Sequence, residues 1–408
     1  MDRRPGATAE VRALARLGCA ELSGATSGTH RVHRAISDRV FAGVGLGVGA
    51  FAAPVKALHD GITDGVYLAI TTAMDTAGEV GGRFADLGLT TPPSETVRGA
   101  ALIGVIQGLI GDDLEATKSP LAAEPMTVRV AGRAVPLDAD RLTGAFPEAR
   151  SRLVVFLHGL VETEHAWSLG GGPTFGERLA AEGGVSPVFV RYNTGRRISE
   201  NGRALAELLE GLVDGWPVPI EDVVLVGHSM GGLVARSAAH HAETVGMAWP
   251  AGLSATVTLG TPHLGAPLET LAHYGSAALV KLPETAPFGR MLRRRSGGIR
   301  DLRAGSIVDE DWSGRDADAL GRAAAAEIPL PVGSAHYFVA ATVTRSRRNP
   351  VGRVVGDGLV LLPSASGRSR ARRICFDPAN GMHLPRAHHF TLLHDEAVYA
   401  RLREWVRG

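Results

Sequence analysis

The chain has 408 residues, of which 45% are hydrophobic and 21% charged, and its formal net charge is +1. This length is enough to bury a full core, and the nearly balanced charge gives no reason to expect a nucleic-acid partner. The two cysteines, Cys19 and Cys375, exclude a disulfide scaffold but leave a single bridge open. Residues 1–20 carry arginines throughout and lack an apolar core, so we expect no secretory signal peptide and a cytoplasmic location.

Residues 1–125 are predicted to form a glycine-rich helical region. The uncharged run at residues 40–55 has glycines at alternate positions from 43 to 49, a spacing that lets helices approach closely. It is shorter than the roughly 20 residues that a membrane-spanning helix needs. Two interpretations stay open: a buried helix hairpin, or peripheral contact with a membrane. Amphipathic helices are expected at residues 62–74 and 102–110.

From residue 126 onwards, short apolar runs alternate with amphipathic stretches. Continuous apolar runs are typical of buried parallel strands, and strands that alternate with helices indicate an α/β fold with helices on both faces of a mostly parallel sheet. The chain ends with a helix that places Val398, Leu402 and Trp405 on one face. The expected strands are residues 126–130, 134–137, 153–157, 187–190, 223–226, 255–259, 337–343 and 373–376.

We assign residues 126–408 to this domain and expect a cap insertion within it at about 263–335. The alternating pattern breaks down there, although an apolar stretch remains at residues 277–282. Long insertions of this kind are often functional. An ordinary structural insertion is the alternative.

The most specific chemical signal is the segment Gly227-His228-Ser229-Met230-Gly231, which lies between an apolar strand and a helix. Such a serine occupies a strained strand-to-helix turn, and the flanking glycines remove side chains that would clash. The segment therefore indicates that Ser229 is a nucleophile. A plain glycine-rich turn is the alternative.

A serine nucleophile also needs donors that stabilise the negative charge developing on the attacked carbonyl. His158-Gly159-Leu160 follows an expected strand, in the place where α/β-hydrolases carry one such donor. We expect the backbone N–H groups of Leu160 and Met230 to be the two donors, each contributing about 3 kcal/mol. His158 is expected to support this loop without taking part in the chemistry.

Asp357 is the candidate for the triad acid. It lies in Gly356-Asp357-Gly358, and glycine on both sides allows the backbone to turn a carboxylate towards the carboxyl edge of the sheet. Asp309 and Asp311 are alternatives within the expected cap. A simple turn aspartate is the structural alternative for Asp357.

His389 is the candidate for the general base, because it follows the last expected strand and precedes the final helix. His388 is the main rival, and His394 is expected to cap that helix or face solvent. The order serine, aspartate, histidine along the chain agrees with α/β-hydrolases and differs from other serine hydrolase folds.

Residues 126–408 resemble bacterial lipases and esterases of the α/β-hydrolase fold, in the branch that includes hydrolases similar to GPI inositol-deacylases. The resemblance implies Ser229, Asp357 and His389 as the catalytic triad and Leu160 and Met230 as oxyanion donors. It also suggests that His263 lines the site, with a structural role as the equal alternative. The motifs that carry the resemblance are residues 156–160, 191–195, 226–232, 259–263 and 356–360.

These patterns predict a serine carboxylic-ester hydrolase, a lipase or esterase, that acts on small-molecule or lipid esters and needs no cofactor or metal. One alternative keeps the triad and changes the substrate, giving a thioesterase, an amidase or an acyltransferase. The other is a non-catalytic scaffold associated with a membrane. The complete set of Ser, Asp and His candidates argues against the scaffold.

Overall fold

The computed structural model describes residues 6–14, 17, 91–122, 125–266, 295–315, 325–369 and 372–407. The apolar run at 40–55, the amphipathic helix at 62–74 and the apolar stretch at 277–282 lie outside these residues. The chain divides into two compact units: residues 1–106 with 113–124, and residues 107–112 with 125–408. A domain boundary near residue 125 and the cap insertion stay predictions.

The first unit is helical where it is described. Residues 7–14 are helical, and η2 (Pro93–Glu95), α4 (Val97–Ala116) and η3 (Pro120–Ala122) follow later in the chain. Thr96 caps α4 by accepting a hydrogen bond from the N–H of Gly99 at 3.1 Å. Glu10 accepts hydrogen bonds from the N–H and the hydroxyl of Ser94 at 2.9 and 2.7 Å. Residues 102–110, where a helix was expected, lie within α4, although Ile110 departs from helical geometry with φ −140° and ψ 25°.

The second unit is built on an eight-stranded sheet with the order β2-β1-β4-β3-β5-β6-β7-β8. Strand β1 is antiparallel to both β2 and β4, whereas β3 to β8 are parallel to one another. The strand order reverses between β3 and β5, and ligands of open α/β sheets bind beyond the carboxyl ends of strands at such a point. The strands are β1 (Thr127–Val130), β2 (Arg133–Val135), β3 (Arg152–Leu157), β4 (Ser186–Arg191), β5 (Asp222–His228), β6 (Leu253–Leu259), β7 (Ala335–Thr342) and β8 (Gly381–Pro385).

The last strand differs from the prediction. Residues 373–376 form only an isolated bridge between Arg373 and Arg368, and Ile374 and Phe376 pack in a small cluster with Phe338. The edge strand is instead β8, whose sequence Gly-Met-His-Leu-Pro lacks β-branched residues. Pro385 ends this strand, and proline is tolerated at a sheet edge because its missing N–H is not needed for further pairing.

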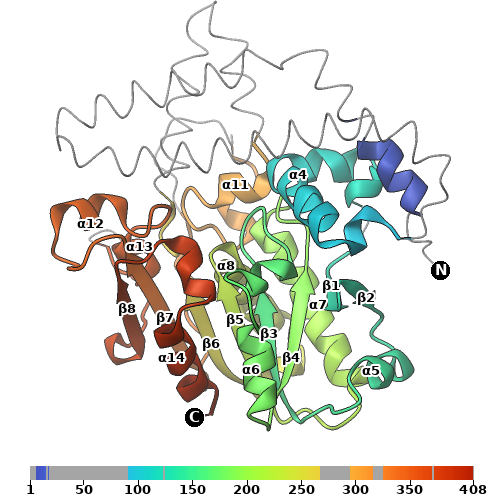
Figure 1. Ribbon diagram of the computed structural model, residues 1–408. Coiled ribbons are helices and arrows are strands. Elements are labelled where there is room, and N and C mark those ends of the chain that lie inside the picture. The colour runs from blue at the N-terminus through green and yellow to red at the C-terminus, as the bar shows by residue number, and fades with distance from the viewer. Residues whose placement is uncertain are drawn as a thin grey trace, which may run out of the picture. The chain divides into compact units, whose positions relative to one another are not determined.

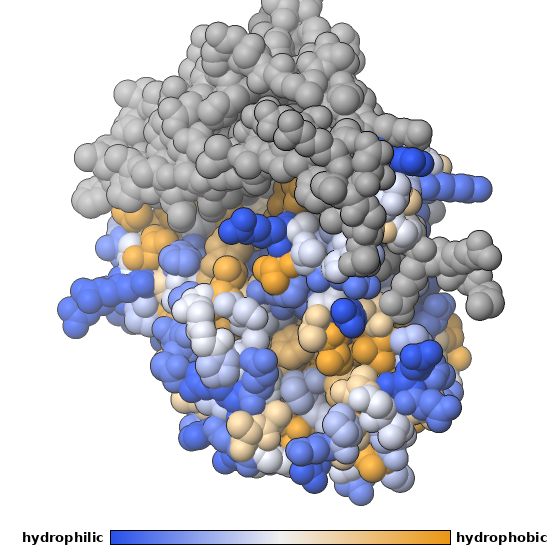
Figure 2. Space-filling model, turned by 45° about the vertical axis from the view of Figure 1, so that its right-hand side comes forward, coloured by the Kyte–Doolittle hydropathy of each residue, from blue (hydrophilic) through white to orange (hydrophobic). Residues whose placement is uncertain are grey.

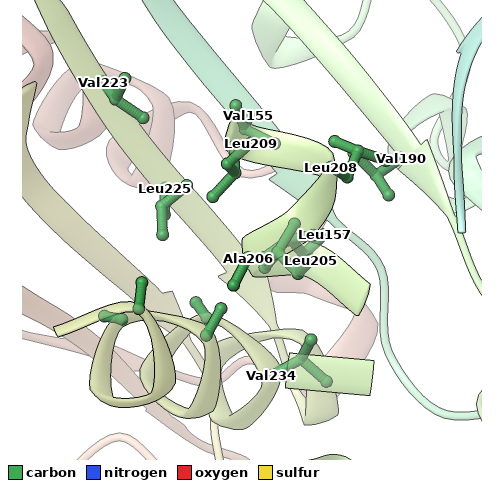
Figure 3. Packing of buried hydrophobic residues seen from close by; sticks show 14 of the residues in the cluster. Val155, Leu157, Val190, Leu205, Ala206, Leu208, Leu209, Val223, Leu225 and Val234 are labelled. Atoms are coloured by element: carbon green, nitrogen blue, oxygen red, sulfur yellow. The ribbon is translucent and has the colours of Figure 1, made fainter. Parts of the chain in front are cut away.

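Helices cover both faces of the sheet, as Figure 1 shows. On one face, Val155, Leu157 and Leu225 pack against α7 and α8 (Figure 3). On the other, Val154 and Phe156 pack in a cluster with residues of α6 and α14. Adjacent residues of a strand point to opposite faces, so one apolar run serves both layers. The helices are α5 (Ala139–Ala145), α6 (Phe175–Ala181), α7 (Ile198–Gly215), α8 (Met230–Val245), α11 (Gly297–Asp301), α12 (Pro350–Val355), α13 (Leu362–Ala365) and α14 (Glu396–Arg407), with short 3-10 turns η4 (Glu164–Ser168), η5 (Trp249–Gly252), η6 (Asp309–Asp311), η7 (Pro378–Asn380) and η8 (His389–Leu393).

The described part of the expected cap is held on α7 by polar contacts. The buried carboxylate of Asp301 accepts hydrogen bonds from Arg197 at 2.7 Å and from the N–H of Ile198 at 2.8 Å. Asp309 pairs with Arg203 at 2.7 Å, and the indole of Trp312 donates to the hydroxyl of Ser199 at 3.0 Å. These bonds fix residues 295–315 against the first turns of α7.

The surface in Figure 2 shows apolar residues in several separate patches among hydrophilic ones. The most exposed large apolar side chains lie on different elements and loops; they are Val97, Leu169, Val245, Val332 and Val354. Within the described ranges, no helix combines the length and the apolar character that crossing a membrane requires.

Candidate active site

Ser229 lies between the end of β5 and the first residue of α8, in a conformation with φ 51° and ψ −119°. This positive φ is unusual for a residue with a side chain and costs on the order of 1–3 kcal/mol. The N–H of Ser229 donates to the carbonyl of Leu259 at 2.8 Å, which ties the turn to β6. The fold thus holds the serine in the strained geometry of a nucleophile elbow.

Two glycines let the strands and α8 meet at this turn. A Cβ added at Gly227 would overlap the backbone of Gly232, and one added at Gly231 would overlap the carbonyl oxygens of Leu157 and His158. Backbone atoms cannot move aside as the end of a flexible side chain can. The elbow therefore requires glycine at both positions.

Gly227→Ala and Gly231→Ala are each expected to lower the free energy of unfolding by at least about 3 kcal/mol, because the overlap falls on backbone. Gly144→Ala is the matched control, since nothing lies within 4 Å of its added Cβ in α5. That control should be neutral or gain about 0.5–1 kcal/mol. Urea unfolding measures all three, and an elbow variant as stable as the parent would contradict this interpretation.

The two expected oxyanion donors follow the carboxyl ends of β3 and β5: Leu160 lies in the loop after β3, and Met230 begins α8. Met230 is the first residue of α8, so its N–H has no acceptor within the helix. The N–H of Leu160 has no acceptor in the described part of the chain, while the next N–H, that of Val161, donates to Thr194 at 3.2 Å. A helix N-terminus also favours nearby negative charge.

His158 is buried and supports the loop, as its predicted role requires. Its ring stacks on Tyr192 at 4.3 Å, and the Tyr192 hydroxyl donates to its carbonyl at 2.6 Å. Burial lowers the pKa of His158 to about 4, so the ring is neutral at physiological pH. Nδ1 then donates to the carbonyl of Gly159, and Nε2 accepts from the N–H of Tyr192.

Asp357 lies in a loop that returns to the end of β7, where the N–H of Val343 donates to the carbonyl of Gly356 at 2.9 Å. Gly356 and Gly358 have φ of 61° and 103°, which are conformations that glycine adopts without strain. Oδ1 of the buried Asp357 carboxylate accepts from the N–H groups of Leu359 and Val360 at 3.0 and 2.8 Å. Oδ2 is left for a third donor.

That donor is His389, whose Nδ1 lies 2.7 Å from Oδ2 of Asp357. The N–H of His389 also donates to the carbonyl of Asp357 at 3.0 Å, so backbone and side chain fix the pair together. Burial alone would lower the pKa of His389, but the charge and hydrogen bond of Asp357 outweigh it and raise that pKa above its ordinary value. This arrangement directs Nε2 away from the aspartate and orients the imidazole as a general base requires.

Ser229 follows β5 and His389 follows β8, so both lie beyond the carboxyl ends of parallel strands. A Cβ added at Gly260, just after β6, would lie 3.1 Å from Cε1 of His389, and the rings of His389 and His228 are 4.7 Å apart. His228 directly precedes Ser229. The Ser229 hydroxyl has no hydrogen-bond partner among the described residues. A hydrogen bond from this hydroxyl to Nε2 of His389 is therefore proposed and not observed. Catalytic hydrogen bonds often tighten only when substrate is bound.

The rival residues have other surroundings. His388 and His394 are exposed. Asp309 pairs with Arg203, and Asp311 accepts hydrogen bonds from the N–H groups of Ile307 and Ala326 at 3.0 and 2.6 Å. Asp357 is therefore the carboxylate that contacts His389.

The structure decides between the two roles left open for His263 and adds one residue, Glu162, that the sequence did not suggest. His263 is fully buried, with Nε2 3.2 Å from the hydroxyl of Thr258 and Nδ1 3.5 Å from Arg236, which indicates a structural role. Glu162 was not singled out by any motif. Its carboxylate accepts hydrogen bonds from the N–H of Gly159 at 2.6 Å and from His228 at 3.0 Å. The only sequence signal is an acidic residue three positions after Gly159, in a loop that follows a buried strand.

The sheet order, the strained serine between β5 and α8, and the later aspartate and histidine loops define an α/β-hydrolase fold. Among the described residues, no group of three or more His, Cys, Asp or Glu side chains is placed to hold a metal ion.

Residues 189–277 match the family described as PGAP1-like alpha/beta domain. This range includes the nucleophile elbow but not Leu160, Asp357 or His389. No curated protein matches the sequence.

Several solved structures are similar to the chain at low identity. The mature form of Bacillus licheniformis lipase BlEst2 is 17% identical, with 64% of this chain and 93% of that chain covered and a TM-score of 0.41. The RedJ thioesterase from the prodiginine biosynthetic pathway of Streptomyces coelicolor is 19% identical, with coverage of 64% and 92% and a TM-score of 0.34. The Pyrobaculum calidifontis esterase is 16% identical, with coverage of 64% and 77% and a TM-score of 0.36.

Proposed function

We propose that this protein is a serine carboxylic-ester hydrolase in which Ser229 is the nucleophile, His389 the general base and Asp357 the residue that orients the base. The backbone N–H groups of Leu160 and Met230 hold the oxyanion. The observation that carries the proposal is the buried contact of 2.7 Å between Asp357 and His389, which lie 32 positions apart in the chain. A strained serine after β5, beyond the carboxyl ends of the same parallel strands, supports it.

The reaction proceeds by acyl transfer in two steps. His389 takes the proton of the Ser229 hydroxyl as its oxygen attacks the ester carbonyl, and the two backbone donors stabilise the tetrahedral oxyanion. The alcohol leaves with the proton from His389. Water then attacks the acyl-enzyme by the same route and releases the acid, while Asp357 stabilises the imidazolium that forms in each step.

We further propose that the substrate carries an apolar, lipid-like acyl chain. The apolar segments at residues 40–55 and 277–282 of the sequence motivate this choice. A series of p-nitrophenyl esters from acetate to palmitate, with thioesters of the same acids alongside, tests it. We expect kcat/KM for octanoate to exceed that for acetate by at least about tenfold, because each added methylene gains apolar contact. A sharp preference for acetate would instead define a small-ester esterase, and a preference for the thioester series would define a thioesterase.

A further inference from the structure

Glu162 and His228 form a second buried carboxylate–histidine pair beside the candidate triad. Oε2 of Glu162 lies 3.0 Å from Nδ1 of His228, and their side chains are 8% and 0% exposed. A carboxylate only accepts, so Nδ1 of His228 is the donor. Nε2 of His228 lies 3.4 Å from the backbone carbonyl of His389. The triad mechanism itself makes no use of either residue.

One carboxylate oxygen ties together the two chain segments that carry the oxyanion donors. Oε2 of Glu162 also accepts the N–H of Gly159 at 2.6 Å, and Gly159 directly precedes Leu160. Its other partner, His228, directly precedes Ser229. The pair therefore joins the loop after β3 to the elbow after β5.

The loop needs such a restraint because its conformation is strained. Val161 has φ 60°, an outlier for a β-branched residue. A Cβ added at Gly159 would lie 3.0 Å from both Oε2 of Glu162 and Cβ of Ser229, so the loop passes close to the serine and a side chain at this position would be crowded. Oxyanion donors gain their effect from being fixed before the reaction begins.

The charge of Glu162 makes its partner necessary. Burial alone would raise the pKa of Glu162, but His228 and the N–H of Gly159 outweigh burial and keep the pKa below its ordinary value. An ionised carboxylate close to the oxyanion would oppose the developing negative charge. A positively polarised N–H from His228 on the same oxygen reduces that opposition.

We propose that Glu162 and His228 are positioning residues for the ester hydrolysis proposed above: Glu162 anchors the oxyanion loop, and His228 offsets its charge at the moment the oxyanion forms. The inference rests on that function. It assigns no contact with substrate to either residue.

A double-mutant comparison at mildly alkaline pH tests whether His228 offsets the charge of Glu162. His228→Phe keeps a ring but removes the donor, and should lower kcat about 100-fold with KM within about threefold. Adding Glu162→Gln to this variant removes the uncompensated charge and should recover about tenfold in kcat. A double variant no faster than His228→Phe would overturn the role of His228, because two losses of purely structural support do not rescue each other.

Single variants of Glu162 test whether this residue anchors the oxyanion loop, and they leave the buried ring of His228 unchanged. The amide oxygen of Gln can still accept from Gly159, so Glu162→Gln should lose at most about tenfold in kcat, whereas Glu162→Ala should lose about 100-fold or more. Equal losses would overturn the anchor. Glu207→Gln, on an exposed position of α7, is the charge control and should match the parent.

Thermal unfolding and fluorophosphonate labelling of every variant distinguish a failure of the proposed function from a failure of the positioning pair alone. A parent chain that hydrolyses no ester and accepts no fluorophosphonate would overturn the proposed function and this inference together. A parent that does both, with variants that behave additively, would overturn the positioning pair alone.

Discussion

Ser229→Ala is expected to lower ester hydrolysis by at least about 10⁴-fold in kcat while the chain stays folded. If Ser229 is the nucleophile, its removal abolishes the acyl-enzyme route and leaves only the contribution of the oxyanion donors and of substrate binding, as triad deletions in serine hydrolases show. Alanine keeps the Cβ, so it neither adds bulk to the elbow nor relieves its strain. Stopped-time hydrolysis of a p-nitrophenyl ester measures the loss, and thermal unfolding reports on the fold.

Ser254→Ala is the matched control for this substitution. Ser254 lies on β6 at the opposite edge of the sheet, and it is exposed. We expect its kcat to remain within about twofold of the parent, as for other surface changes. A Ser229→Ala protein that retained more than a few per cent of the activity would rule out Ser229 as the nucleophile.

The second large effect is expected at the aspartate–histidine pair. Asp357→Asn should reduce kcat by about 10³- to 10⁴-fold, because the amide no longer holds the imidazole in the required tautomer or stabilises its charged form. His389→Ala should be at least as severe. His388→Ala, which removes the exposed neighbour, should leave kcat within about twofold of the parent. The reverse order of effects would make His388 the base.

The pH dependence of kcat/KM tests the Asp357–His389 pair in a second way, through the direction in which the acid limb of the profile moves. His389 must be neutral to accept the serine proton, and Asp357 raises its pKa above the ordinary value. Activity is therefore present at higher pH and falls as the pH drops through that raised pKa. In Asp357→Asn the carboxylate is lost and burial remains, so the pKa falls and the acid limb of the residual activity should move to lower pH. A limb that moved to higher pH, or did not move, would contradict the pairing.

Sequence patterns predicted the central part of the fold because its signals are local. The apolar runs at residues 153–157 and 223–226 can be buried only between helical layers, and they appear as β3 and β5. The Gly-His-Ser-Met-Gly segment was equally informative, since glycine at positions 227 and 231 is a steric necessity of the turn. The glycines around Asp357 also have the positive φ that their positions implied.

Other features depend on tertiary contacts that no local pattern records. Ile374 and Phe376 look like strand residues, but they pack against Phe338, while the less apolar β8 pairs with β7 because that edge was open. Glu162 carries no motif, and its two hydrogen-bond donors, Gly159 and His228, are brought to it only in the folded chain. The 107–112 segment of α4 likewise belongs to the second unit without any sequence signal.

Mass-spectrometric mapping of a fluorophosphonate adduct tests the central claim most directly, because this reagent phosphonylates an activated serine and needs no knowledge of the natural ester. The account predicts one stoichiometric adduct on the peptide that contains Ser229, slow labelling in Asp357→Asn and none at this position in Ser229→Ala. An adduct on another serine, or an unlabelled parent chain that remains folded, would contradict it.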